Sequence, residues 1–319
     1  MNRQQRRRLE ALRPRIQAGV LPSEDIDLAW SLANRAMLEE KAGDGGPFLP
    51  AWQLIMGANR FALSSRVTAL AEDLRISDLS VTVRSLDKGA PLPGRTWLEW
   101  DAKVEGRWDP LPGQVPIDRV GVLIEADETG QRGTMHCFAR PAPTRAREVG
   151  VPDISPIAIT FDLRENYERP ASLIEPASVE DVRAMHARVS DPTMAEVEGS
   201  AVITAALSRR FGAIESPLVS DIVRRRLGLG DRRWSEVHQD LFITSVNEAM
   251  QEVLLAVSAF IVSRTVGIGV TDVRRGAGRR MATHGIDTVP LGYGIWDVPP
   301  VTDRAGLGWL SKRAEGGRL

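Results

Sequence analysis

The chain has 319 residues and a formal net charge of −1, with 26% charged and 43% hydrophobic residues. These values are typical of globular proteins, so they exclude a chain that is disordered throughout and a protein whose overall charge attracts nucleic acid. The single cysteine, Cys137, cannot form an internal disulfide, so we expect a reducing compartment, the cytoplasm.

No membrane segment is expected. The first fifteen residues are basic, but no apolar stretch follows them, so they do not have the pattern of a secretory signal. The most apolar stretch runs from Val253 to Val262, about half of the roughly twenty residues that a transmembrane helix needs. Polar residues precede this stretch, and we predict a buried helix of a soluble protein.

Residues 1–76 are predicted to be helical. Ser23, followed by two acidic residues, fits the start of a helix, and apolar residues recur at helical spacing from Ile26 to Met37. The turn residues at 44–47 end this helix, and a second helix is predicted over 60–74.

Residues 77–170 are predicted to be rich in strands, because apolar and polar side chains alternate. In the segment 96–101, this alternation places Leu98 and Trp100 on one face and Trp97, Glu99 and Asp101 on the other. Strands are predicted over 81–83, 96–104, 120–124, 134–140 and 157–163, with a hairpin turn at 127–130.

Residues 171–319 are predicted to be mainly helical. Helices are expected over 178–189, 194–210, 217–227 and 235–266, followed by a basic, glycine-rich loop and a closing strand over 288–298. The last helix is the longest and most apolar, which indicates a central core helix. Pro290 confines the closing strand to an edge or to a strand start.

This order of elements favours the α+β class with a mostly antiparallel sheet, because regular β-α-β alternation is missing. A parallel, doubly wound sheet is the alternative. The regions 1–76, 77–170 and 171–319 are separate domains or parts of one integrated domain. Gly228 and Gly230, like Gly267 and Gly269, follow predicted helices, which favours helix ends over phosphate-binding loops.

Metal-binding motifs of histidine and cysteine are missing from the sequence. His136 and Cys137 are the one neighbouring pair, but adjacent strand residues point to opposite faces, so the two cannot readily share a metal or act together as nucleophile and base. We therefore predict no zinc site and no Cys–His catalysis.

One carboxylate pattern has catalytic potential. Asp101 and Lys103 form a D-x-K tripeptide, with Glu99 on the same strand face and Asp87 upstream. This resembles the signature of metal-dependent nucleases, in which carboxylates bind Mg²⁺ and a lysine stabilises developing negative charge. The other interpretation is a solvent-exposed strand face, because residues 96–130 hold eight acidic side chains against three basic ones.

Arginine is the dominant basic residue: only four of the 41 basic residues are lysine. A GC-rich genome is the simplest reason, because arginine codons are GC-rich. Two clusters remain as candidate binding segments for nucleic acid or an acidic protein, one in residues 1–15 and one in the glycine-spaced loop 272–280. The second contains Arg274, Arg275, Arg279 and Arg280.

Three segments resemble uncharacterised proteins encoded in prophage-like or mobile regions of GC-rich alphaproteobacteria. They are MNRQQRRR at the start, Leu92 to Trp100, and Arg279-Arg280-Met281 running on to Val289–Tyr293. The resemblance implies a mobile-element context and supplies no catalytic residues. The sequence thus predicts a non-catalytic interaction protein that binds nucleic acid or an acidic partner through its arginine-rich segments. A Mg²⁺-dependent phosphodiesterase or nuclease is the alternative.

Overall fold

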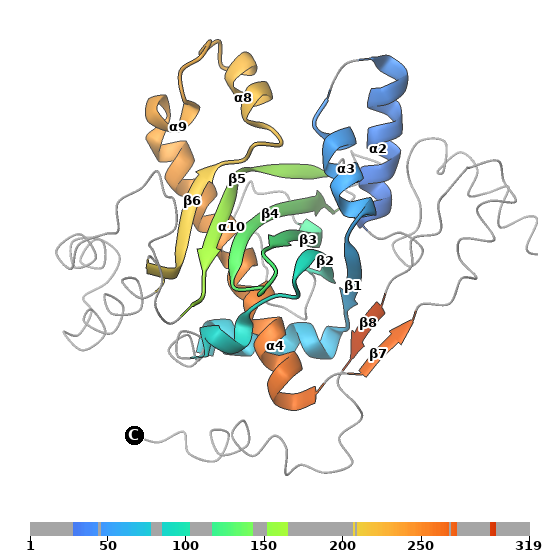
Figure 1. Ribbon diagram of the computed structural model, residues 1–319. Helices are drawn as coiled ribbons and strands as arrows, with labels where there is room; N and C mark the ends of the chain where they lie inside the picture. The colour runs from blue at the N-terminus through green and yellow to red at the C-terminus, as the bar shows by residue number, and fades with distance from the viewer. Residues whose placement is uncertain are drawn as a thin grey trace, which may run out of the picture.

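The computed structural model describes residues 28–43, 46–77, 85–102, 117–142, 152–164, 207, 209–267, 269–272 and 294–297. An eight-stranded sheet forms the centre of this part of the chain, in the order β6-β5-β4-β3-β2-β1-β8-β7 (Figure 1). The strands are β1 (Asn59–Leu63), β2 (Gly94–Asp101), β3 (Ile117–Ala126), β4 (Arg132–Pro141), β5 (Asp153–Asp162), β6 (Phe211–Glu215), β7 (Gly269–Asp272) and β8 (Gly294–Asp297).

Strand pairing makes the sheet mixed but mostly antiparallel. Strands β2 to β6 pair antiparallel in chain order, whereas β1 runs parallel to both of its neighbours, β2 and β8. The α+β class is therefore confirmed. Strands from all three predicted regions lie in this one sheet. The closing strand β8 lies between β1 and the edge strand β7, so its predicted position at an edge is wrong.

Helices cover both faces of the sheet. One face packs against α2 (Leu28–Ala42) and α3 (Phe48–Met56), and the other against α4 (Ser65–Ser77) and α10 (Gln239–Val262). Shorter helices complete the described part: η1 (Leu86–Gly89), α8 (Ser220–Arg226), α9 (Trp234–Val237) and η2 (Ser263–Gly267). In Figure 1, α8 and α9 stand beyond one end of the sheet.

The long helix α10 is the central core helix that its apolar sequence predicts. Every residue from Val253 to Val262 is buried, and Phe260 packs edge-on against Trp296 of β8. By length and composition alone, Gln239–Thr265 could cross a membrane, but 67% of its most apolar window is buried inside the protein. A core helix of a globular protein passes the same test.

The alternation predicted for β2 is confirmed, but the expected solvent exposure of its polar face holds only for Asp101 and is wrong for Trp97 and Glu99. Leu98 and Trp100 pack in the cluster that includes α10, and Trp97 packs in the cluster that includes α2 and α3. Because these two helices cover the second face as well, Trp97 and Glu99 are fully buried.

Two further expectations need correction. The helix predicted over 60–74 begins only at Ser65, because the preceding residues form β1 and pair with β2 in parallel register. The helix predicted over 235–266 is interrupted at His238, whose φ of −123° and ψ of 61° are not helical. Helix α3 and strand β6 were not predicted. The elements expected within 1–27, 81–83 and 178–206 lie outside the described residues.

A cluster of carboxylates lies between α4 and α10. Glu72 of α4 is buried and forms an ion pair with Arg75 one helical turn later. The half-buried Glu252 of α10 lies close to both, and Glu248 lies one turn before it. The pKa of Glu252 is raised to about 7, mainly by burial; the charge of Arg75 opposes the rise, and the charges of Glu72 and Glu248 add to it. Burial, and then the charge of Glu252, also raise the pKa of the Cys137 thiol on β4.

Replacing Glu252 with glutamine is expected to stabilise the protein in a pH-dependent way. The pKa of Glu252 is higher in the folded than in the unfolded chain, so wild-type stability falls as pH rises from the unfolded value through about 7. The variant should gain about 2 kcal/mol in urea unfolding near pH 8 and nothing near pH 4. The exposed Glu128→Gln should gain nothing at either pH. An equal gain for Glu252→Gln at both values would contradict the assignment.

Candidate functional site

Glu99, one of the predicted catalytic residues, holds the start of α2 against the sheet. Its Oε1 accepts hydrogen bonds from the backbone N–H of Leu28 at 2.6 Å and from Nη2 of Arg119 at 2.8 Å. Its Oε2 accepts hydrogen bonds from Nε1 of Trp97 at 3.2 Å and from the backbone N–H of Ala29 at 3.4 Å. A carboxylate at the first N–H groups of a helix satisfies them and complements the helix dipole. Glu99 therefore has a structural role that occupies both of its oxygens.

The other members of the carboxylate pattern do not join Glu99. Asp101 ends β2 and is exposed, whereas Glu99 is buried beneath α2. Asp87 belongs to η1, which packs against α10 on the opposite face of the sheet from Glu99. The side chain of Asp87 and the whole of Lys103 lie outside the described residues. Within the part of the chain that the structure describes, no three histidine, cysteine, aspartate or glutamate side chains are grouped so that they could hold a metal ion.

Internal ion pairs account for other acidic residues of the sheet. Asp118 and Arg140, both buried, are joined by two hydrogen bonds of 2.9 and 3.1 Å. Oε2 of Glu125 lies 3.6 Å from Nε2 of His136, and Oε1 of Glu125 accepts a hydrogen bond of 2.8 Å from Nε of Arg95. The hydrogen bond from His136 lowers the pKa of Glu125 to about 2 against the effect of burial, with a further contribution from Arg95. These side chains stabilise the sheet and do not form an open acidic surface.

His136 and Cys137 lie on opposite faces of β4, as their spacing predicts. His136 contacts Glu125, whereas the Cys137 thiol donates to the backbone oxygen of Ala249 in α10 at 3.6 Å. The two side chains therefore cannot act on one substrate or ligand. The predicted binding residues Arg274, Arg275, Arg279 and Arg280 lie outside the described residues, as does the cluster in residues 1–15.

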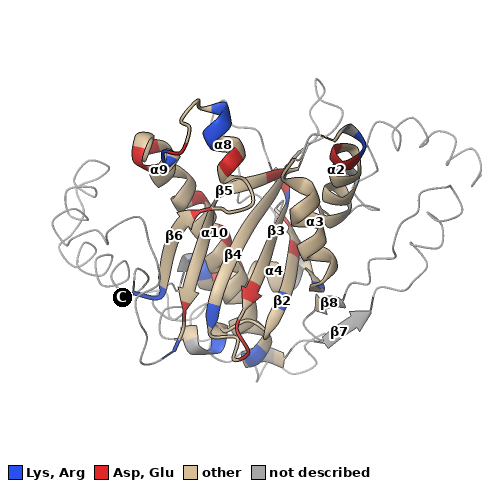
Figure 2. Cartoon of the chain, turned by 45° about the horizontal axis from the view of Figure 1, so that its top comes forward, with Lys and Arg blue, Asp and Glu red and all other residues tan. Residues whose placement is uncertain are grey.

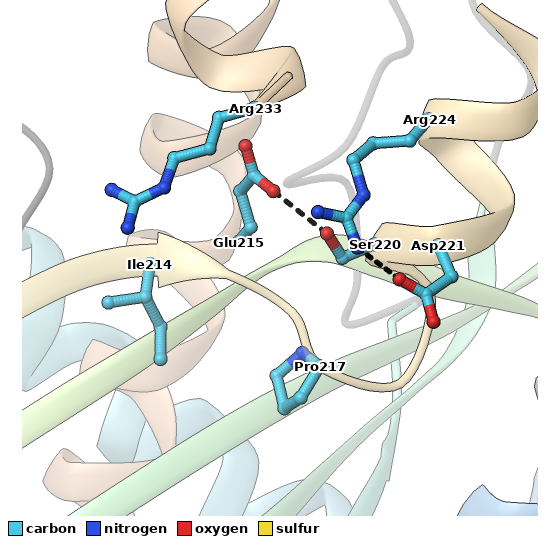
Figure 3. A pocket seen from close by; sticks show the side chains of 7 residues that line it. All are labelled: Ile214, Glu215, Pro217, Ser220, Asp221, Arg224 and Arg233. Carbon is cyan, nitrogen blue, oxygen red and sulfur yellow. Dashed lines mark hydrogen bonds and ion pairs between the residues drawn. The ribbon is translucent and has the colours of Figure 1, made fainter. Parts of the chain in front are cut away.

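A pocket lies where the end of β6 meets α8 and the segment before α9. Its volume is about 410 Å³, and Figure 3 shows Glu215 near its centre, with Arg224 and Arg233 on opposite sides. Ile214 and Pro217 contribute apolar surface. The pocket thus combines an apolar floor with charged walls, a lining that suits a side chain or small group of mixed character.

The carboxylate of Glu215 accepts hydrogen bonds from two elements that flank the pocket. Oε1 accepts hydrogen bonds from the backbone N–H and the hydroxyl of Ser235, at 3.0 and 2.7 Å, and Oε2 accepts one from the hydroxyl of Ser220 at 2.8 Å. Burial alone would raise the pKa of Glu215, but these hydrogen bonds outweigh it and lower the pKa. Glu215 is therefore an anion that joins α8 to α9.

Two arginines of one short segment, Arg224 and Arg233, line this pocket. Residues 224–233 contain five arginines against one acid, Asp231. We define the arginine surface as these five residues: Arg224, Arg225, Arg226, Arg232 and Arg233. All but Arg224 are exposed, and Figure 2 shows that the basic part of α8 is the end that points away from the sheet.

Two glycines and one buried tryptophan position the arginine surface. Gly228 and Gly230 have positive φ values of 65° and 60°, which end α8 and turn the chain, as the sequence predicts. Trp234 then packs edge-on against Phe242 of α10, with their ring centroids 5.5 Å apart, and is fully buried. The loop between α8 and α9 is therefore anchored in the core at its Trp234 end.

Comparisons with protein-family models, with curated proteins and with solved structures find no match. The resemblance to prophage-encoded proteins stays a prediction. Sequence reasoning also missed the arginine surface, although its signal, five arginines in ten residues around a Gly-Leu-Gly turn, is present in the sequence.

Proposed function

We propose that this chain is a non-catalytic interaction protein that binds an acidic macromolecule through the arginine surface. One observation carries the proposal. Arg226, Arg232 and Arg233 are exposed, and within the described residues their guanidinium groups have no carboxylate partner. Guanidinium groups bind carboxylates and phosphates through paired hydrogen bonds, so unpaired ones on a surface suit an acidic ligand.

Arginines of the sheet contrast with this surface. Each of five contacts a carboxylate of the chain: Arg95, Arg119, Arg132, Arg140 and Arg164. Coding bias explains why arginine replaces lysine throughout, but it does not explain why three neighbouring arginines lack acidic partners. This difference supports a binding role for the region around α8 and α9. The cluster Arg274–Arg280 remains a second proposed contact.

Retention on heparin across a salt series tests the proposal. Replacing Arg226, Arg232 and Arg233 together with alanine should lower the salt needed for elution, and each lost contact should reduce the slope of log affinity against log salt by about one. The matched control is Arg95→Ala with Arg132→Ala, whose side chains are 45% and 48% exposed but already paired. Equal elution of the two variants would overturn the proposal. A variant lacking the four arginines of 274–280 measures the contribution of that loop.

The nuclease alternative has less support. Glu99 cannot assist a metal ion while its oxygens hold α2 and Arg119. Asp87, Asp101 and Lys103 stay a predicted site. Mg²⁺-dependent cleavage of a fluorescent DNA substrate that Asp101→Asn abolishes would establish it.

A further inference from the structure

Large apolar side chains are exposed beside the arginine surface. Among the described residues, seven such side chains are exposed, and four of them lie within residues 227–243. They are Leu227 (39% exposed), Val237 (42%), Leu241 (50%) and Ile243 (47%). The other three lie far apart in sequence, in α2, before β2 and at the start of β3. Single exposed apolar residues are common, but a group of them marks an interaction site.

These four residues and the arginines belong to packed neighbours. Helix α9 contacts both α8 and α10, and Figure 1 shows α8 and α9 standing beyond the end of the sheet. Leu227 follows α8, Val237 ends α9, and the other two lie in the first turns of α10. We call the arginine surface together with Leu227, Val237 and Leu241 the docking surface, because Ile243, two residues after Leu241, lies on the other side of α10.

The charges of the docking surface favour a protein over a nucleic acid. Acidic residues alternate with the arginines: Asp221, Asp231, Glu236 and Asp240 lie in or beside it, and all are exposed. The surface therefore carries charges of both signs and does not form the continuous basic track that a phosphate backbone needs. The aromatic ring nearest to the arginines, that of Trp234, is fully buried and offers no stacking platform for bases. Apolar side chains with a polar, charged surround are instead the pattern of protein interfaces.

We propose that the docking surface binds an acidic amphipathic segment of another protein, with its apolar side chains against Leu227, Val237 and Leu241 and its carboxylates against Arg226, Arg232 and Arg233. This inference rests on the proposed function and names the class of partner. The pocket between Arg224 and Arg233, with Ile214 and Pro217 in its lining, accepts one side chain of the segment.

Fluorescence anisotropy with three probes tests the inference. The first probe is a synthetic helical peptide with glutamates on one face and leucines on the other, the second is the same peptide with every leucine changed to serine, and the third is duplex DNA. The wild-type protein should bind the first peptide roughly tenfold more tightly than the second, because burying partly exposed apolar side chains contributes about that factor. Changing Leu227, Val237 and Leu241 together to serine should remove this preference and leave heparin retention unchanged.

Different outcomes distinguish the inference from the proposed function. If the serine variant keeps the preference, or if DNA binds more tightly than the leucine peptide, the partner class is wrong while the arginine surface stands. If the Arg226, Arg232 and Arg233 variant binds every probe like the wild type, the proposed function itself falls. Analytical ultracentrifugation of the unliganded protein tests whether a second copy of the chain covers the docking surface. A dimer in the wild type that becomes monomeric in the serine variant would overturn the inference. Urea unfolding of each variant verifies that the fold is kept.

Discussion

Replacing Glu99 with alanine is expected to destabilise the protein by about 3–5 kcal/mol, because the change breaks a buried ion pair. Arg119 would lose its carboxylate, and the backbone N–H of Leu28 and the indole N–H of Trp97 would lose their acceptor. Each such loss leaves a desolvated donor at the contact between α2 and the sheet. Urea unfolding followed by tryptophan fluorescence measures the effect.

An exposed glutamate in a turn of the same sheet, Glu128, provides the control for Glu99→Ala. Glu128 lies exposed in the turn between β3 and β4, and its replacement with alanine should change the free energy of unfolding by no more than about 0.5 kcal/mol. Glu99→Gln keeps the volume and one acceptor, so it should fall between the two. If Glu99→Ala and Glu128→Ala unfold at the same urea concentration, Glu99 does not hold α2 in place.

Two substitutions of Trp234 should differ strongly in their cost to stability. Trp234→Ala removes a fully buried ring that packs on Phe242, and we expect a loss of about 3–5 kcal/mol. Trp234→Phe should cost less than about 1 kcal/mol. The buried Nε1 of Trp234 has no hydrogen-bond partner in the described part of the chain, so removing this N–H offsets most of the lost volume.

Heparin retention extends this comparison to the docking surface. At temperatures where both variants are folded, Trp234→Phe should elute like the wild type, because the loop between α8 and α9 stays anchored. Trp234→Ala should elute at lower salt, because Arg232 and Arg233 lose their fixed position. Equal stability of the two variants would show that the ring of Trp234 does not anchor this loop.

Local patterns predicted the antiparallel strands β2 to β5 and the core helix α10 well. The repeat of apolar residues in these elements is visible within each short segment of sequence. The turn at 127–130 also has residues typical of hairpins. Strand β1 was mistaken for helix because its register comes from parallel partners distant in sequence: Phe61 pairs with Leu98 on one side and with Gly294 on the other. No local pattern reports such pairing.

The sequence could not predict which charged side chains are buried or paired, and this limited the prediction of the site. Glu99 alternates correctly with Leu98 and Trp100, but its sequence neighbours do not reveal that α2, some seventy positions earlier, covers it. The same limit applies to Arg226, Arg232 and Arg233. Their lack of carboxylate partners, which distinguishes them from Arg119 and Arg140, becomes visible only when three-dimensional contacts are known.

The position of β8 beside β1 has a consequence for how the chain folds. Trp296 pairs with Leu63, so β1 and β8, near one edge of the sheet, join segments separated by most of the chain, a pairing of high contact order. Strands β2 to β6 can pair successively as they are synthesised, but the outer edge of β1 stays open until the segment around residue 296 has emerged from the ribosome. An open strand edge is a template for pairing with other chains. Nascent or truncated forms that lack β8 should therefore be the aggregation-prone species of this protein.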